Sequence, residues 1–223
     1  YSPVLIFMTY IYLSIIYSQT VSIKVFSVRL KSIIPKKFMV RGDEYMELWD
    51  AYDRNLEKIE GMTLIRGEKI PEGVYHLVCD VIVRHTDGEY LLMQRDRRKH
   101  YGGMWEATAG GSALQGENPL DCAIRELREE TGIHTERLEE VGRVWAAGRN
   151  TVYCEFLCIT DCRKDSIILQ EGETSAYQWV TQDELLSMKR EELVTERMQM
   201  FVDGLKPGIR SDEDRSIYEF VPE

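Results

Sequence analysis

The sequence predicts an α/β protein in which helices pack on a mixed β-sheet. Apolar runs rich in β-forming residues alternate along the chain with segments whose apolar residues recur at helical spacing. The composition is that of an ordinary globular protein, since 43% of the 223 residues are hydrophobic and 30% are charged. A chain of this length can bury a large core without the help of disulfides.

The predicted sheet opens with two antiparallel strands at residues 74–83 and 90–94. Both are apolar runs rich in β-forming residues, and Asp87-Gly88 between them is a hairpin signal. Three later segments have the same character and complete the sheet: residues 141–146, 151–160 and 176–180.

The clearest helix is predicted over residues 119–131. Asn118 is a natural N-cap, Pro119 suits the first helical position, and Gly132 suits the left-handed residue that ends a helix. Further helices are expected at 182–189 and 191–201. Four apolar residues of the first helix share a stripe about 100° wide, which we expect to pack on the sheet: Leu120, Ala123, Ile124 and Leu127.

The net charge of −10 is unevenly distributed. Residues 1–38 contain five of the 28 Lys and Arg residues and none of the 38 acids, so residues 39–223 carry a net charge of −15. A protein that binds duplex nucleic acid needs a basic face, so we do not expect such a partner. The acidity suits a small phosphorylated substrate accompanied by a divalent metal ion.

Residues 1–38 form an apolar and basic extension ahead of the predicted domain at 39–223. Residues 4–16 are almost continuously apolar, which raises the question of a membrane span within residues 1–23. The alternatives are a dispensable extension, a misjudged start or a buried part of the fold. The positive charges from Lys24 onward would hold the remainder on the cytoplasmic side of a membrane, and we expect a cytoplasmic protein.

The five cysteines, at positions 79, 122, 154, 158 and 162, contain no C-x-x-C pair. Cys154 and Cys158 fall on one face of the strand predicted at 151–160. We therefore expect reduced, structural cysteines and no zinc site.

Three carboxylates, Glu126, Glu129 and Glu130, share one face of the helix predicted at 119–131. Crowded like charges raise carboxylate pKa values and destabilise a helix that has no other role for them. A bound cation would relieve the repulsion, and all-oxygen ligation suits Mg²⁺, or alternatively Mn²⁺.

The segment from Gly111 to Ile133 matches the pattern GX5EX7REUXEEXGU, with U a bulky aliphatic residue, at every specified position. This segment resembles the Nudix hydrolase family, and the resemblance extends over about residues 47–186. It implies an α/β/α sandwich around a mixed β-sheet, with the motif forming a loop–helix–loop. It also implies Mg²⁺-dependent hydrolysis of a diphosphate (pyrophosphate) bond in a nucleoside-diphosphate-linked or related small substrate.

The resemblance also implies roles for individual residues. Glu126, Glu129 and Glu130 would bind the metal together with Gly111, in a Gly110-Gly111 turn that allows close approach of the backbone. Two further residues of the motif would be structural, because Arg125 is expected to pair with Glu117 and fix the loop on the helix. Arg125 as a solvated partner of Glu129 is the alternative.

The general base is left open between a glutamate of the motif, Glu129 or Glu130, and an acid on a later loop, for which Glu173 is best placed. Arg95, at the end of a predicted strand, is expected to contact a phosphate of the substrate. Trp105 would line the pocket, or simply pack. The charges at residues 97–99 are interpreted as solvated loop charges.

Two other functions compete with hydrolysis. Residues 47–53 and 66–77 are similar to the corresponding part of Nudix proteins related to isopentenyl-diphosphate isomerase, and His76 matches one isomerase histidine. The isomerase needs a cysteine followed by a metal-binding histidine, and residues 107–112 contain neither. A nucleotide-sensing module without turnover would typically lose glutamates that this chain keeps. We therefore expect a hydrolase, with a homodimer as the assembly to test for.

Overall fold

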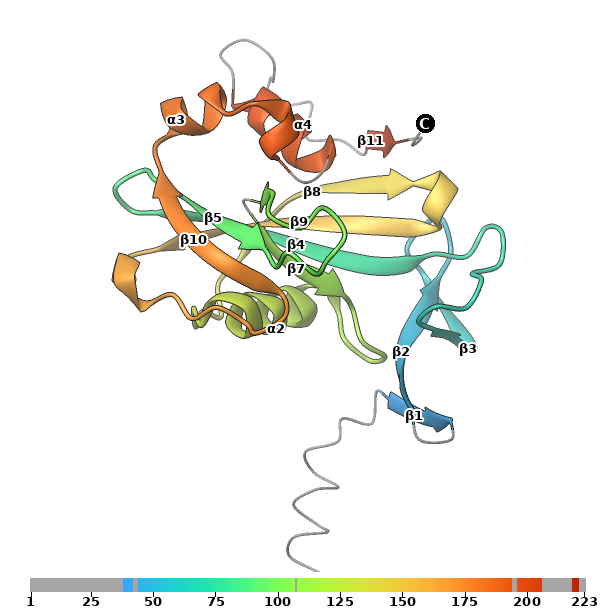
Figure 1. Ribbon diagram of the computed structural model, residues 1–223. Helices are drawn as coiled ribbons and strands as arrows, with labels where there is room; N and C mark the ends of the chain where they lie inside the picture. Colours follow the sequence, from blue (N-terminus) through green and yellow to red (C-terminus); the bar gives the residue numbers. More distant parts are fainter. Residues whose placement is uncertain (1–37, 42–43, 107, 194–195, 206–217, 221–223) are drawn as a thin grey trace, which may run out of the picture. The chain divides into compact units, whose positions relative to one another are not determined.

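The computed structural model describes residues 38–41, 44–106, 108–193, 196–205 and 218–220 (Figure 1). The expectations for residues 1–37, including the membrane anchor, lie outside these residues. Within the described part, no helix is long and apolar enough to cross a membrane. The chain divides into two compact units between Glu47 and Leu48.

The described part of the first unit is a short antiparallel pairing. Strand β1 (Phe38–Arg41) runs alongside the first residues of β2 (Glu44–Tyr52). Phe38 lies opposite Glu47, and Arg41 lies opposite Glu44.

The second unit is built on a mixed sheet, as the sequence predicts. Its main path runs in the order β10-β5-β4-β9-β8-β11, while β6 pairs with β5 and β7 pairs with β4. Strands β4 and β9 are parallel over ten paired positions, β8 and β11 are also parallel, and the other neighbours are antiparallel. The strands are β4 (His76–His85), β5 (Tyr90–Arg95), β6 (Trp105–Glu106), β7 (Thr108–Ser112), β8 (Glu139–Ala146), β9 (Thr151–Thr160), β10 (Thr174–Val180) and β11 (Tyr218–Phe220).

A smaller pairing precedes the main sheet. The second half of β2, from Leu48 to Tyr52, lies antiparallel to β3 (Lys58–Ile65). An isolated bridge between Tyr52 and Tyr75 connects it to the chain just before β4. Trp49 stacks on His76 with ring centroids 4.2 Å apart, which gives His76 a packing role.

Helices cover both faces of the main sheet (Figure 1). Helix α2 (Pro119–Thr131) packs on one face through an apolar cluster that includes Leu127 and Cys79. Helices α3 (Gln182–Ser187) and α4 (Glu196–Gly204) cover the other face through a cluster that includes Leu185 and Leu92. The predicted fold class, an α/β/α sandwich around a mixed β-sheet, is confirmed.

Helix α2 has the predicted bounds because its caps form as the sequence indicates. The Asn118 side chain accepts a hydrogen bond from the Asp121 N–H, and Gly132 adopts φ 73°. The predicted apolar stripe needs correction, because Leu120 in the first turn is 38% exposed. The small or polar side chains of Cys122 and Thr131, which a hydrophobic stripe does not single out, are buried instead.

Three other predicted elements differ from the structure. The helix expected at 182–189 ends at Ser187. The helix expected at 191–201 is a 3-10 turn, Arg190–Glu192, and then α4, which starts only at Glu196. Gly110 and Gly111 form no turn, since they lie within β7 and pair with β4.

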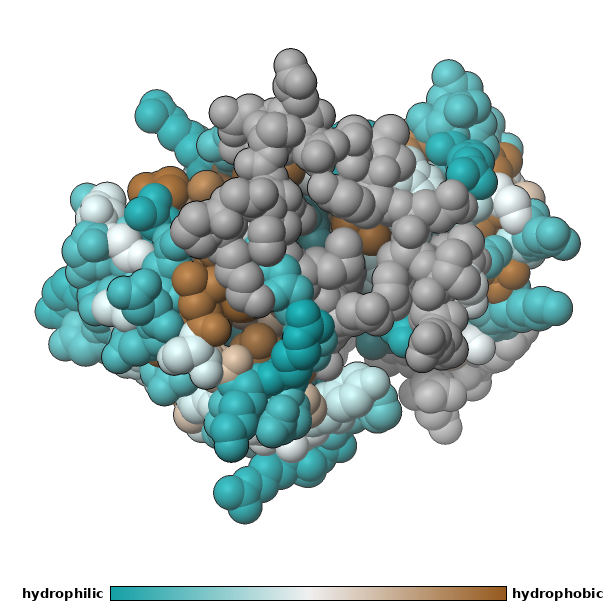
Figure 2. Space-filling view, turned by 90° about the horizontal axis from the view of Figure 1, so that it is seen from above, coloured by the Kyte–Doolittle hydropathy of each residue, from teal (hydrophilic) through white to brown (hydrophobic). Residues whose placement is uncertain are grey.

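The polarity of the described surface is typical of a globular protein, and the cysteines are unpaired thiols. Seen from the side of α3 and α4, the described surface is largely hydrophilic, with hydrophobic residues in separate areas (Figure 2). All five cysteines lie in the described part and are free, as expected, and Cys154 and Cys158 are buried on one face of β9.

Candidate active site

The motif helix and the glycine strand lie against each other at the centre of the site. Strand β7 pairs with β4 from Val78 to Ile82, and the Cys122 thiol of α2 donates a hydrogen bond to the Gly111 carbonyl over 3.5 Å. Glu126 lies one turn further along the helix and Glu130 lies two turns further, and both side chains reach β7. Carboxylates of α2 are therefore held against the backbone of β7.

Glu130 is the most deeply perturbed carboxylate of the site. It accepts a hydrogen bond from the Gly110 N–H over 3.3 Å. Burial, followed by the charges of Glu126 and Glu106, raises the pKa of Glu130 to about 8, although Lys99 and the Gly110 N–H act in the opposite direction. The metal-free protein thus keeps a proton on this carboxyl at neutral pH.

Glu126 lies directly over Gly111. A Cβ added at Gly111 would fall 2.6 Å from the Glu126 Cδ, so only glycine leaves room for this carboxylate. Arg125 Nη1 donates to Glu126 Oε1 over 2.6 Å.

Arg125 connects the loop of the motif to its helix, as predicted. Its Nε and Nη2 atoms donate to the two Glu117 carboxylate oxygens, each over 3.0 Å. Nη2 also donates to the Ser112 carbonyl over 3.1 Å. Glu117 is buried and accepts a further bond from the Leu114 N–H over 3.0 Å. Arg125 Nη1 also lies 3.3 Å from Glu129, but the Arg125 side chain is only 17% exposed and is not the solvated partner of the alternative.

Cationic side chains from the loop after β5 form the opposite wall. Lys99 pairs with Glu173, which lies just before β10. Burial and the charge of Arg95 lower the Lys99 pKa, while Glu130 and Glu106 oppose this shift. Lys99 is therefore no solvated loop charge, contrary to the sequence interpretation, because it faces the carboxylates. Sequence reasoning missed this pair, whose members are 74 residues apart.

Arg95 and Trp105 lie next to this wall. Arg95 Nη1 donates to Glu106 over 2.6 Å, and its Nε donates to the His100 carbonyl over 3.0 Å. Burial raises the Glu106 pKa, although Arg95 acts in the opposite direction. Trp105 is half-buried and packs against the apolar cluster beneath α4, next to Leu193. A substrate contact for Trp105 stays a prediction.

The donor set suits a hard divalent cation. Burial, together with the charges of Glu126 and Glu106, raises the pKa of Glu130, and a bound cation would stabilise the ionised carboxylates. Carboxylate and backbone oxygens are the ligands such ions prefer. As the side chains stand, no three His, Cys, Asp or Glu residues of the described ranges converge closely enough to hold one ion. Glu129 is 40% exposed and points toward Arg125.

A sequence model of the NUDIX domain matches residues 74–201, and the chain therefore belongs to the Nudix hydrolase family. It is similar to an uncharacterized Nudix hydrolase of Listeria monocytogenes, with 33% identity over 146 residues, which cover 65% of this chain and 85% of the relative. It is also similar to a MutT-like protein of Streptomyces ambofaciens, with 31% identity over 63% of this chain and 84% of that protein.

Two solved structures share the fold at low sequence identity. A Deinococcus radiodurans protein superimposes with a TM-score of 0.56 at 17% identity, over 74% of this chain and all of that one. A Nudix hydrolase from Nitrosomonas europaea superimposes with a TM-score of 0.56 at 15% identity, over 83% of this chain and 99% of that protein.

Two adjacent glycines allow a matched test of the contact between β7 and α2. In Gly111→Ala the three atoms nearest to the new methyl group all belong to the flexible end of Glu126, so we expect stability to change by about 1 kcal/mol or less while hydrolase activity falls at least about tenfold. In Gly110→Ala the methyl group would lie 2.6 Å from the Cys79 backbone carbonyl, so we expect a loss of more than about 2 kcal/mol. Urea unfolding and turnover measure both, and full activity of Gly111→Ala would show that the position of Glu126 does not matter.

Proposed function

We propose that the protein hydrolyses a diphosphate bond in a nucleoside-diphosphate-linked or related small substrate, with Mg²⁺ or Mn²⁺ as cofactor. The observation that carries the proposal is the pair of carboxylates, Glu126 and Glu130, packed against the Gly110-Gly111 backbone beside Lys99. The proposal is also supported by the sequence motif from Gly111 to Ile133, which is complete in this member of the Nudix hydrolase family.

The cofactor would be held by Glu126, Glu129, Glu130 and the backbone at Gly111. When bound, such an ion polarises phosphoryl oxygens and lowers the pKa of a coordinated water. Arg125 has a positioning role, because hydrogen bonds from its Nε, Nη1 and Nη2 atoms fix Glu117 and Glu126 in place. Of the three residues in this network, Glu117 is buried, while Arg125 and Glu126 are partly exposed.

Lys99 and Arg95 would orient the anionic substrate. Both lie beside the carboxylates and both have carboxylate partners, Glu173 and Glu106, in the structure. A diphosphate offers these cations the same kind of oxygen acceptor, so substrate phosphates would exchange with Glu106 and Glu173 as partners. The exchange would free Glu173 beside the substrate.

For the general base we propose Glu173. Its side chain is 37% exposed and can meet water, whereas Glu130 is only partly exposed and its raised pKa, about 8, favours the protonated form at neutral pH. Glu129, the other candidate, faces Arg125. A base that is both ionised and reachable suits proton removal from an attacking water.

Glu173→Gln tests the base. We expect kcat to fall about a hundredfold with little change in KM, because the amide cannot accept the proton but preserves the shape of the side chain. Glu171→Gln, an exposed acid two residues earlier, is the matched control and should retain full activity. Turnover of Glu173→Gln within about twofold of the parent would assign the base to Glu129 or Glu130 instead.

The proposed activity is tested by a Mg²⁺-dependent screen of nucleoside triphosphates, nucleotide sugars, dinucleotides and prenyl diphosphates. Release of phosphate or nucleoside monophosphate, abolished by a chelator, is the expected result. Allylic product from isopentenyl diphosphate would indicate the isomerase, and binding without turnover would indicate a sensing module. We further propose that residues 39–223 suffice, so the chain without residues 1–38 should give the same rates.

A further inference from the structure

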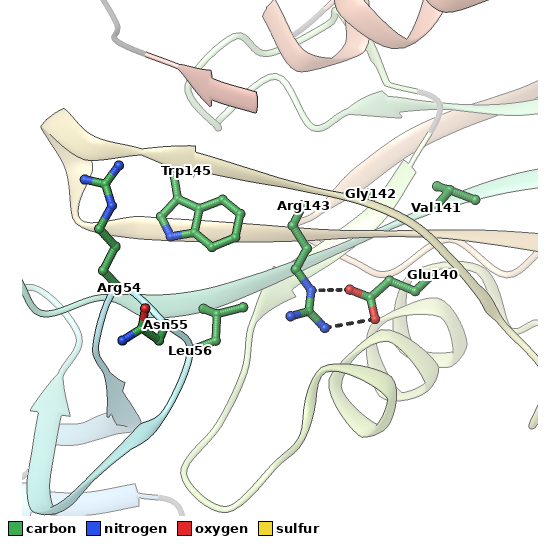
Figure 3. A pocket seen from close by; sticks show the side chains of 8 residues that line it. All are labelled: Arg54, Asn55, Leu56, Glu140, Val141, Gly142, Arg143 and Trp145. Carbon is green, nitrogen blue, oxygen red and sulfur yellow. Dashed lines mark hydrogen bonds and ion pairs between the residues drawn. The ribbon is translucent and has the colours of Figure 1, made fainter. Parts of the chain in front are cut away.

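A second pocket, of about 590 Å³, lies between strand β8 and the turn formed by residues 53–57 (Figure 3). Trp145 and Arg143 line it from the strand, and Arg54 and Leu56 line it from the turn. None of its lining residues belongs to the carboxylate site. Its volume is in the range of pockets that bind small molecules.

One wall of this pocket carries a buried donor with no acceptor. Trp145 is 8% exposed, and within the described structure its indole Nε1 has no hydrogen-bond partner. An orphaned buried N–H is unfavourable, and most proteins satisfy such groups. A ligand carbonyl or ring nitrogen would supply the missing acceptor.

The residues that line the pocket include more arginines than acids. Two arginines, Arg54 and Arg143, line it, and Glu140 is the one acid among its lining residues. Glu140 pairs with Arg143 through two contacts, of which the one from Nη2 measures 3.1 Å (Figure 3). The guanidinium groups of both arginines can form charge-assisted hydrogen bonds with an anionic group of a ligand. The Trp145 ring and Leu56 provide apolar surface for a planar ring.

The turn at residues 53–57 holds Leu56 in an unfavourable conformation. Leu56 has φ 62°, which is uncommon for a residue with a bulky side chain. Asp53 fixes the turn, because its Oδ1 accepts from the Asn55 and Glu57 N–H groups over 2.8 and 2.9 Å. Such strain often marks a ligand site. The Trp145 Nε1 atom is shielded from water, so a ligand that accepts its hydrogen bond must first displace a neighbouring part of the pocket wall.

We propose that this pocket binds a small anionic ligand whose planar ring carries a hydrogen-bond acceptor for Trp145 Nε1. Nucleoside monophosphates and aromatic carboxylates share this chemistry. The site is separate from the carboxylate cluster, and the inference does not depend on the proposed diphosphate hydrolysis.

Calorimetric titration of the full chain in a chelator tests the proposal. The probes are guanosine monophosphate and nicotinate, which combine ring, acceptor and charge, with guanosine and inorganic phosphate as partial probes. We expect at least one complete probe to bind about tenfold or more tightly than either partial probe. Trp145→Phe keeps the ring but removes the N–H, so we expect binding about five- to tenfold weaker. Arg54→Gln should weaken it about tenfold.

Matched variants separate the pocket from other effects. Arg190→Gln removes one exposed arginine elsewhere, and Glu130→Gln alters the carboxylate site; both should bind the probes like the parent. Near-ultraviolet circular dichroism will check that Trp145→Phe is folded. The proposal would be overturned if no complete probe bound up to about 5 mM, or if a partial probe bound as tightly as a complete one. It would also be overturned if both pocket variants kept the affinity of the parent, or if Glu130→Gln lost binding.

Discussion

Glu130→Gln is expected to lose about a thousandfold in turnover while the fold stays intact. The substitution preserves the shape of the side chain but removes a charged oxygen from the carboxylate pair packed against β7. The neutral amide of glutamine binds a divalent cation more weakly than an ionised carboxylate does. Rates on a substrate identified in the screen measure the effect, and near-normal turnover would contradict the proposed role of Glu130.

The same variant should gain stability in metal-free solution at high pH. The folded-state pKa of Glu130, about 8, lies above its ordinary value of 4.5. The protonated group's contribution to stability is fully present below about pH 4.5 and is lost as the pH rises through about 8, because the folded state then gives up its extra proton. Glutamine undergoes no such loss, so above pH 8 the variant should be more stable, on the order of 2–4 kcal/mol.

Urea unfolding in a chelator, at pH 5 and pH 8.5, measures this difference. Glu171→Gln removes an exposed carboxylate and should show no comparable gain. A Glu130→Gln variant no more stable than the parent at pH 8.5 would mean that Glu130 carries no strain from burial and its neighbours.

Arg125→Gln is expected to destabilise the protein by about 3–5 kcal/mol. Arg125 is the cation paired with the buried Glu117, and it also contacts Glu126. Burial opposes its charged form, but the hydrogen bond to Glu117 and the charge of Glu126 outweigh burial and raise its pKa. Its removal leaves a buried carboxylate without this partner, which costs more than the net worth of the pair.

Urea unfolding measures the Arg125 effect, with two comparisons. Arg98→Gln breaks an exposed pair with Asp96 and should change stability by about 0.5 kcal/mol or less. Arg125→Lys keeps the charge but loses the forked geometry, so an intermediate loss is expected. A loss below about 1 kcal/mol for Arg125→Gln would show that Glu117 is stabilised by other groups.

Local signals explain why parts of the fold were predictable. The bounds of α2 follow from side chains within or next to it, Asn118, Pro119 and Gly132, and these caps form in the structure. Strands β4, β5 and β9 consist mostly of apolar residues. The sequence of strand β7 gives almost no such signal, because it contains Gly110 and Gly111. These two residues join the sheet through backbone pairing with β4.

Contacts between distant segments explain the remainder. The pairing of Arg125 with Glu117 spans eight residues within one motif and is predictable from it. The pairing of Lys99 with Glu173 spans 74 residues and depends on β5 and β10 being neighbours in the sheet. The order of strands was not predictable from the sequence, so Lys99 was interpreted as a solvated charge.

Mn²⁺ binding, followed by electron paramagnetic resonance of the full chain, most directly tests whether the carboxylates on α2 form a divalent-metal site. We expect the parent and Arg190→Gln to bind Mn²⁺ equally, and Glu126→Gln and Glu130→Gln each to bind at least about tenfold more weakly. Mn²⁺ affinity that is unchanged in both glutamate variants would contradict the account.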